Sequence, residues 1–380
     1  MLNLDLIGAE VLGPDGLHRD GLSFAQGVIV DAPVGRAVDL SGYLVLPGIV
    51  DVHGDGFERH LAPRRGAMKQ MSEGLIAVEA ELAANGITTA TLAQFISWEG
   101  GVRGYEFAEQ VFTHLRDIGP TMVTDLRGQL RFETHQLDFY DELPAKMAEW
   151  GLRYIVFNDH LPHDRLREGR QPRRLVSQAL KARRSPETHL ALMQALEAAS
   201  DEVPQALDWL CAQLAAQGIA MGSHDDTTAS QRAEWAARGV SVAEFPETLE
   251  AAEAAANAGN AVVMGAPNVV RGGSHNLNLS AIDLIAMGYC DALASDYHYP
   301  SARRAALMLW QNGMRDLNGA WDMVSAGPAR VLGLQDRGVL SAGMRADMVV
   351  LDRETLRVCA TLVQGRLSHL SGDIAARFMG

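Results

Sequence analysis

The chain has 380 residues, a formal net charge of −14 at pH 7 and a hydrophobic fraction of 47%. That length exceeds one common domain but suits one α/β barrel with a small appendage, and the hydrophobic fraction is enough for a large core. The negative charge disfavours a general nucleic-acid binder or a binder of anionic membranes. No stretch of about 18 uncharged apolar residues occurs, and no basic N-terminal region precedes an apolar segment, so we predict neither a transmembrane helix nor a secretory signal.

The three cysteines, Cys211, Cys290 and Cys359, lie far apart and form no pairing pattern. This usage suits the reducing cytoplasm and argues against both a disulfide framework and a thiolate zinc site. We therefore expect a cytoplasmic protein. Its 33 basic residues include only three lysines, which leaves 30 arginines. Arginine suits phosphate through its fixed fork of donors, but position has to decide whether any of them binds an anion.

Both ends of the chain contain short strand-like runs separated by turn residues. Near the N-terminus they fall at 4–11 and 27–31, with a Gly-Pro-Asp-Gly turn between them, and the last 45 residues have the same character. Chain termini commonly lie close together. We therefore predict one small β-sandwich built from residues 1–45 and 336–380.

Between these ends, short apolar runs alternate with segments rich in Ala, Leu and Glu. Alternating βα units of this number predict a parallel sheet, most simply a (β/α)8 TIM-type barrel over residues 46–335. One of its helices is expected over residues 72–85, where Asn85-Gly86 provides a left-handed stop. The strands are predicted at 44–52, 87–95, 122–132, 153–157, 219–222, 240–245, 261–265 and 292–294.

A long insert over residues 167–217 is helical by composition. It carries a basic cluster, which comprises Arg173-Arg174 and residues 181–184. Long basic side chains commonly cover a helix surface while their charges stay in water. We therefore favour a solvated helical hairpin, with a substrate lid as the alternative.

The segment Val50-Asp51-Val52-His53-Gly54-Asp55 follows the first predicted barrel strand. Side chains two apart on a strand share a face, so His53 and Asp55 point to the same side. A histidine and a carboxylate presented together at a strand end can bind one metal ion as neighbouring ligands. An ordinary polar turn is the alternative that this motif alone leaves open.

More residues of ligand type lie where the other predicted strands end, which is where α/β barrels place their chemistry. Each one alone could be a hydrogen-bonded residue of the barrel rim, and for Glu244 we favour a structural hydrogen bond. Two metal ions about 3.5–4 Å apart would explain most of these residues together. The set consists of His53, Asp55, Glu133, His160, His224, Glu244 and Asp296.

In this hypothesis His53 and Asp55 hold the first ion. His160 and His224 hold the second ion, and Glu133 bridges the pair. A divalent ion can lower the pKa of bound water from about 15.7 to about 7, and a second ion stabilises the oxygen on which charge develops.

Asp296 completes the set as a ligand that also faces the reactive water. We predict that it takes the proton of that water and returns it to the leaving group. The implied reaction is metal-assisted hydrolysis, and the ligand set by itself does not define the substrate.

Two arginine-containing segments bear on the substrate. The first, residues 57–66, contains Arg59, Arg64 and Arg65 close to the predicted metal ligands. The second, Arg271-Gly272-Gly273-Ser274-His275, exposes backbone N–H groups beside a guanidinium, an arrangement that favours phosphate. Surface arginines and an ordinary glycine turn are the alternatives, and for the second segment we favour anion binding. The predicted substrate-binding residues are Arg59, Arg64, Arg271, Ser274 and His275.

Several segments resemble a known family. Residues 46–53 and 338–347 resemble the two ends of the amidohydrolase superfamily. Within that superfamily, blocks spread over nearly the whole chain resemble the phosphonate-metabolism PhnM family. These blocks are His53-Gly54-Asp55, Asn85-Gly86-Ile87-Thr88-Thr89, Leu130-Arg131-Phe132-Glu133, Ser223-His224-Asp225-Asp226, Ala243-Glu244-Phe245-Pro246, Ser295-Asp296-Tyr297 and the highly specific run 264–275.

The resemblance implies a diphosphatase of the carbon–phosphorus lyase pathway. Such an enzyme hydrolyses α-D-ribose 1-methylphosphonate 5-triphosphate to the 5-phosphate and releases pyrophosphate. The resemblance also implies two divalent metal ions, with zinc expected first and manganese or iron as alternatives. The family's metal positions fall on His53, Asp55, Glu133, His160, His224 and Asp296, and its basic positions fall on Arg59, Arg64 and Arg271.

This sequence also departs from the family. Leu161-Pro162-His163 stands where the family has Pro-Gly-Gln, and the two metal-ligand histidines fall on the fourth and fifth strands rather than the fifth and sixth. We therefore expect one strand beyond those counted. The partner is expected to be a small phosphorylated ribose, with no nucleic acid and no membrane, and a homo-oligomer is possible.

Three rival functions stay open. An amidohydrolase could cleave the C–N bond of an amide or a cyclic imide, although the arginine-rich segments argue against a neutral substrate. A divergent relative could hydrolyse another phosphorylated sugar. A non-catalytic scaffold on the same barrel should lack ligands, whereas six are predicted here.

Overall fold

The structure is a computed structural model and describes residues 1–62, 70–272 and 279–379. The chain separates into two compact units, and three strands of the large sheet contribute residues to both. The first unit consists of Met1–Leu92, Ile118–Arg127 and Val263–Gly380, and the second of Ala93–Asp117 and Gly128–Val262.

The large sheet has eight strands, and its strand order follows the order of the chain. The strands are β8 (Ile49–Gly54), β9 (Ile87–Ile96), β10 (Asp125–Glu133), β11 (Tyr154–Asn158), β12 (Ala220–His224), β13 (Val242–Glu244), β14 (Ala261–Gly265) and β15 (Ala292–Ala294). The end of β15 bonds back to β8, because Asp296 N donates to His53 O over 3.0 Å and Gly54 forms a parallel bridge with Asp296. The predicted parallel barrel is confirmed.

The prediction of one additional barrel strand is wrong. Glu133 ends the third strand of the eight-stranded sheet and His224 ends the fifth, as counted from the sequence.

The first predicted barrel strand, 44–52, is in fact two strands that belong to different sheets. β7 (Tyr43–Pro47) pairs antiparallel with β16, and a single residue separates it from the start of β8. The break falls at Gly48, where a Cβ atom would lie 2.3 Å from Thr88 Oγ1. The continuous apolar run concealed this change of sheet because both strands are buried.

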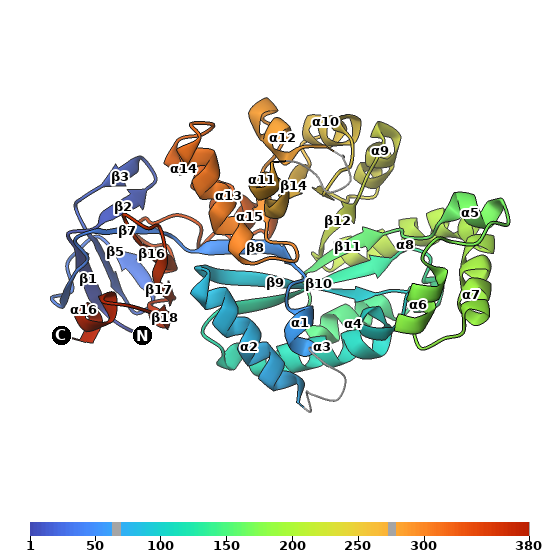
Figure 1. Cartoon of the computed structure of the whole chain (residues 1–380), viewed down its shortest axis with the longest axis horizontal. Helices are drawn as coiled ribbons and strands as arrows, with labels where there is room; N and C mark the ends of the chain where they lie inside the picture. The colour runs from blue at the N-terminus through green and yellow to red at the C-terminus, as the bar shows by residue number, and fades with distance from the viewer. Residues whose placement is uncertain (63–69, 273–278, 380) are drawn as a thin grey trace. The chain divides into compact units, whose positions relative to one another are not determined.

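The two ends of the chain meet in a mixed sheet of order β18-β17-β16-β7-β2-β3, with a second sheet of order β5-β4-β1-β6. Leu2 N donates to Gly365 O over 2.8 Å, and the two termini lie near each other in Figure 1. This pairing is compatible with our proposal that residues 1–45 and 336–380 form one β-sandwich and residues 46–335 form the barrel. The remaining strands are β1 (Leu4–Ile7), β2 (Glu10–Gly13), β3 (Gly16–His18), β4 (Leu22–Ala25), β5 (Val28–Val30), β6 (Ala37–Asp39), β16 (Met348–Asp352), β17 (Val358–Val363) and β18 (Arg366–Leu370).

The predicted helix over 72–85 is α2 (Met71–Ala84), and it ends as expected. Gly86 follows it with φ +81°, in the left-handed region that favours glycine. A Cβ atom there would also lie 2.7 Å from Val349 Cγ2. The other helices of the first unit are α1 (Glu58–Leu61), α11 (Ala266–Arg271), α12 (Ala281–Met287), α13 (Pro300–Gln311), α14 (Leu317–Asp322), α15 (Ala326–Val331) and α16 (Ile374–Met379), with the 3-10 helix η2 (Gly119–Thr121).

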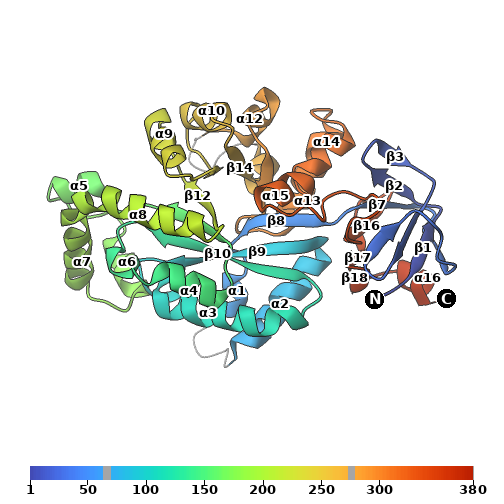
Figure 2. The same ribbon diagram turned by 180° about the vertical axis from the view of Figure 1, so that it is seen from behind.

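The insert in the second unit is more than a hairpin. It contains α6 (Leu175–Lys181), α7 (Pro186–Ala198) and α8 (Val203–Ala216), and α6 and α7 lie near α5 (His163–Arg167) in Figure 2. Trp98, Leu161, Leu175 and Met193 form a buried cluster beneath these helices. The unit also contains α3 (Tyr105–Ile118), α4 (Leu143–Trp150), α9 (Ala229–Ala237), α10 (Leu249–Asn257) and the 3-10 helices η1 (Gly101–Arg103), η3 (Leu137–Phe139) and η4 (Ser200–Glu202).

Within the described ranges, no helix combines the length and apolar character that crossing a membrane requires.

A buried arginine fastens the segment after the barrel to the barrel strands of the first unit. Arg337 is 4% exposed at its side chain, and its Nη1 lies 2.6 Å from Asp125 Oδ2 and 2.8 Å from Thr89 Oγ1. Burial raises the pKa of Asp125, but the charges of Arg127 and Arg337 outweigh it, so the pKa is lowered from its ordinary 3.8. This carboxylate therefore stabilises the fold above its ordinary pKa, and the contribution is lost as the pH falls through the lowered value.

We predict that Asp125→Ala lowers the free energy of unfolding by about 2–4 kcal/mol at pH 7, because the variant removes the less exposed of the two carboxylates that pair with a buried guanidinium. Urea unfolding at pH 7 and below pH 4 measures this, and the difference from wild type should shrink at the lower pH. The control is Asp336→Ala, whose more exposed carboxylate also pairs with Arg337. Equal losses in both variants would contradict the assignment.

Candidate metal centre

In the first unit, β8 and β15 place three predicted ligands together. The ligand atoms of His53, Asp55 and Asp296 all lie within 4.8 Å of one another. The backbone fixes this proximity, since Asp55 N donates to Asp296 O over 3.0 Å. His53 is fully buried. One imidazole and two carboxylates form a donor set that suits a divalent ion.

Asp51 supports this cluster and was missing from the predicted set. Its carboxylate is 1% exposed and accepts hydrogen bonds from Ser295 N, over 2.8 Å, and from Ser295 Oγ. Burial raises the pKa of Asp51 to about 6. Asp51 thus holds the residue directly before Asp296. Its position in the Asp-x-His segment could have indicated such a role, but a strand interior gives no signal of which buried partner lies across the sheet.

In the second unit, Glu133 and His160 are in direct contact. Glu133 is fully buried, and its Oε1 contacts His160 Nδ1 while its Oε2 accepts from His160 N over 3.1 Å. Trp98 Nε1 donates to the same Oε2 over 3.3 Å. Burial lowers the pKa of His160, but the hydrogen bond and charge of Glu133 prevail and raise it. The predicted bridging carboxylate and one predicted histidine ligand are therefore neighbours.

His224 ends β12 and has a polar group at each ring nitrogen. Arg131 Nη2 lies 3.0 Å from Nε2, and Asp225 Oδ2 lies 3.0 Å from Nδ1. Burial raises the pKa of Asp225, but the charge of His224 and its hydrogen bond, together with Arg131, lower it to about 2. A carboxylate that orients a histidine is the usual support for a ligating imidazole.

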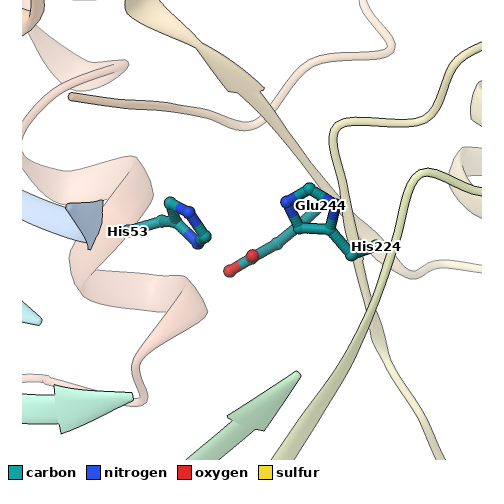
Figure 3. A group of neighbouring side chains, drawn as sticks. All are labelled: His53, His224 and Glu244. Carbon is teal, nitrogen blue, oxygen red and sulfur yellow. The ribbon is translucent and has the colours of Figure 1, made fainter. Parts of the chain in front are cut away.

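Glu244 ends β13 directly beside His224 in the strand register. Its Oε1 accepts hydrogen bonds from Gln129 Nε2, over 2.6 Å, and from Tyr154 OH, over 2.7 Å, so Glu244 makes the kind of structural hydrogen bond that the sequence analysis favoured. Figure 3 shows the side chain of Glu244 beside that of His224, and both residues are candidate metal ligands. The sequence hypothesis gave it no metal role, although it lies at a strand end like the other ligands.

Three strand ends beside candidate ligands have strained backbones. Asp225, Phe245 and Asp296 have φ values of 60°, 54° and 57°, which place non-glycine residues in the left-handed region. Such conformations cost of order 1–3 kcal/mol each and cluster at functional sites. Their recurrence at β12, β13 and β15 supports a functional role for this end of the barrel.

Two of the predicted anion-binding arginines converge next to Asp296. Arg59 Nη1 donates to Tyr297 O over 3.3 Å, and Arg271 Nη1 donates to Tyr297 OH. Arg59 also pairs with Glu81, which offsets part of its charge. The other predicted substrate-binding residues, Arg64, Ser274 and His275, lie outside the described residues.

Comparison with known proteins identifies the family and the fold of this chain. The profile described as "Amidohydrolase family" matches residues 289–369. The chain is 33% identical over 339 residues to the α-D-ribose 1-methylphosphonate 5-triphosphate diphosphatase of Escherichia coli K12, covering 84% of this chain and 86% of that protein.

Solved structures agree in fold at 14% identity. A triazine hydrolase variant covers 100% of this chain and 98% of its own with a TM-score of 0.62. A putative prolidase from Bifidobacterium longum covers 99% and 98% with a TM-score of 0.63.

The parallel barrel, the terminal mixed sheet and the similarity to the relatives above make this chain a member of the amidohydrolase superfamily. Within that superfamily of hydrolases, the chain belongs to the family of the Escherichia coli diphosphatase, known as the PhnM family.

We predict that Asp51→Ala lowers the free energy of unfolding by about 2–4 kcal/mol, because Ser295 N–H and Oγ–H both lose their buried acceptor. Thermal and urea unfolding measure the change. Asp51→Asn, which keeps one carbonyl oxygen for Ser295, should recover part of the loss. If Asp51→Ala is as stable as wild type, Asp51 does not hold the β8–β15 junction.

Proposed function

We propose that this protein hydrolyses a phosphoanhydride of α-D-ribose 1-methylphosphonate 5-triphosphate, giving the 5-phosphate and pyrophosphate. The observation that carries the proposal is 33% identity over 84% of the chain to a diphosphatase named for that substrate. The placement of His53, Asp55 and Asp296 within 4.8 Å of one another supports it independently. We further propose that the protein acts in the cytoplasm, which its three free cysteines favour.

The donor set fits two divalent ions, and we propose zinc first, with manganese or iron as alternatives. His53 and Asp55 would hold one ion. His160 and His224 would hold the other, with Glu133 between them. When bound, the ions supply Lewis acidity that makes water a nucleophile at neutral pH and that stabilises charge on the phosphoryl oxygens.

Two further residues extend this ligand set. Asp296, adjacent to His53 and Asp55, is proposed as a ligand too. Glu244 is proposed in addition, because it pairs in register with His224.

Protein side chains carry the remaining steps. Asp296 takes the proton of the attacking water and delivers it to the oxygen that leaves when the P–O bond of the anhydride breaks. Arg59 and Arg271, which meet at Tyr297, bind phosphoryl oxygens, as do Arg64, Ser274 and His275 in our proposal. A neutral amide or cyclic imide offers these arginines no anionic group to bind, which is why phosphoanhydride hydrolysis is the better-supported reaction.

We expect wild type to release pyrophosphate, and no free phosphate, from ribose-based 5-triphosphates. Asp296→Asn should lower kcat about 100-fold or more, because it removes the proton carrier. Coupled pyrophosphate and phosphate release assays measure both. Asp201→Asn, an exposed aspartate outside the site, serves as the control. Hydrolysis of a cyclic imide without any triphosphate cleavage would favour the rival C–N reaction.

Metal content tests the ligand set separately. Wild type should purify with about two divalent ions per chain. His53→Ala and His160→Ala should each lose about one ion, since each variant removes a ligand of a different ion. Elemental analysis by mass spectrometry measures this. Chelation should abolish hydrolysis, and added zinc, manganese or iron should restore it. Full metal content in both variants would refute the assignment.

A further inference from the structure

The helical insert of the second unit helps to line a cavity that the proposed function does not use. The cavity measures about 430 Å³, a size suited to a small ligand. Its lining includes four arginines, Arg103, Arg165, Arg173 and Arg174, and one carboxylate, Glu99. With histidine neutral, the lining carries three more positive than negative charges, in a chain whose net charge is −14.

The cavity is next to the proposed metal centre. His160, a proposed ligand, is one of the cavity-lining residues. Phe95 connects it with the arginines, since its ring centroid lies 6.0 Å from that of His160 and 4.4 Å from Arg103 Cζ. A substrate bound beside His160 therefore has a positively charged cavity adjoining its reacting end.

Two of the arginines make no compensating contact. Among the described residues, no hydrogen bond or ion pair of the Arg173 or Arg174 side chain occurs, and both side chains are exposed. By contrast, Arg103 pairs with Glu99 over 2.5 Å, and Arg165 Nη1 donates to Gln171 O over 3.0 Å. Two unpartnered guanidiniums lining one cavity can accept an anion without breaking an existing pair.

Hydrogen bonds join the segments that line the cavity. Gln178 Nε2 donates to Glu99 Oε1 over 3.0 Å, and Arg184 Nη1 donates to Trp98 O over 2.6 Å, so the loop after β9 holds the segment with α6. At the start of α5, His163 contacts Asp159 over 2.9 Å and also Glu197 of α7. Arg165 and Arg174 thus extend from backbone segments that the protein holds in place, which lowers the entropic cost of anion binding.

We propose that this cavity binds the terminal phosphates of the substrate, the part that leaves as pyrophosphate. The proposal rests on the proposed diphosphatase function for the source of the anion. Pyrophosphate carries several negative charges close together, which matches several guanidiniums that line one cavity. Arg59 and Arg271 are not among the residues that line this cavity, so the proposal assigns them to another part of the substrate.

The test compares two double variants of the full-length, metal-loaded protein. Arg173→Gln/Arg174→Gln removes the unpartnered cavity charges. Arg170→Gln/Lys181→Gln removes two exposed positive charges of the same insert that do not line the cavity. Calorimetry with inorganic pyrophosphate should show at least a tenfold weaker affinity for the first variant, about 1.4 kcal/mol, and wild-type affinity for the second. Circular dichroism melting should be unchanged in both.

A second probe, methylphosphonate, represents the opposite end of the substrate. Its affinity should be the same in wild type and in both variants. Equal pyrophosphate affinity in all three proteins, equal losses in both variants, or a loss for methylphosphonate alone would each overturn the proposal.

The experiments distinguish a failure of the proposed function from a failure of the proposed anion site. If wild type cleaves no ribose triphosphate but the pyrophosphate affinity still depends on Arg173 and Arg174, the proposed function fails and the anion site stands. With an active enzyme, the cavity variant should show at least a tenfold higher KM for the triphosphate, with a smaller change in kcat. An unchanged KM would overturn the proposal.

Discussion

The hydrogen-bonded junction between the first and last barrel strands is the constraint on which the candidate metal centre depends. His53 and Asp55 come from β8, and Asp296 follows β15, more than 200 residues later in the chain. Backbone bonds from Asp296 N to His53 O and from Asp55 N to Asp296 O bring these ligands together. The buried carboxylate of Asp51 fixes Ser295 at the same junction. The bonds that close the sheet therefore also bring His53, Asp55 and Asp296 together.

This junction contains a buried carboxylate and a strained backbone, which cost folding free energy and which a purely structural barrel would not need. Burial disfavours the charged form of Asp51 and raises its pKa to about 6. The backbone of Asp296 lies in the left-handed region. Similar strain follows His224 and Glu244. Strain and buried charge persist where surrounding structure over-determines them, and they concentrate at functional sites. Their coincidence with the ligand-type residues gives the site a physical basis beyond residue identity.

The sequence was sufficient to predict the barrel, the terminal sheets and the convergence of His53, Asp55 and Asp296, because each follows from strand periodicity or from position at a strand end. It could not reveal that 44–52 is two strands, since both are buried and only the close approach of Thr88 to Gly48 marks the break. The sequence also could not reveal that Arg173 and Arg174 line a cavity. A basic helical insert looks the same in sequence whether its arginines face water or line a cavity, because the opposing wall comes from distant segments.

The acidic and histidine side chains of this protein suit different ligands from its arginines. Carboxylates and imidazoles gather at strand ends, where they suit cations, and we propose that two groups of arginines bind the anionic parts of one substrate. The most direct measurement is a crystal structure of the metal-loaded protein with anomalous scattering recorded at the metal edge. We expect two peaks about 3.5–4 Å apart, one bound by His53 and Asp55, the other by His160 and His224, with Glu133 between them. Peaks bound only elsewhere, for example at His135, Asp159 and His163, or no peak at all, would contradict the proposed centre.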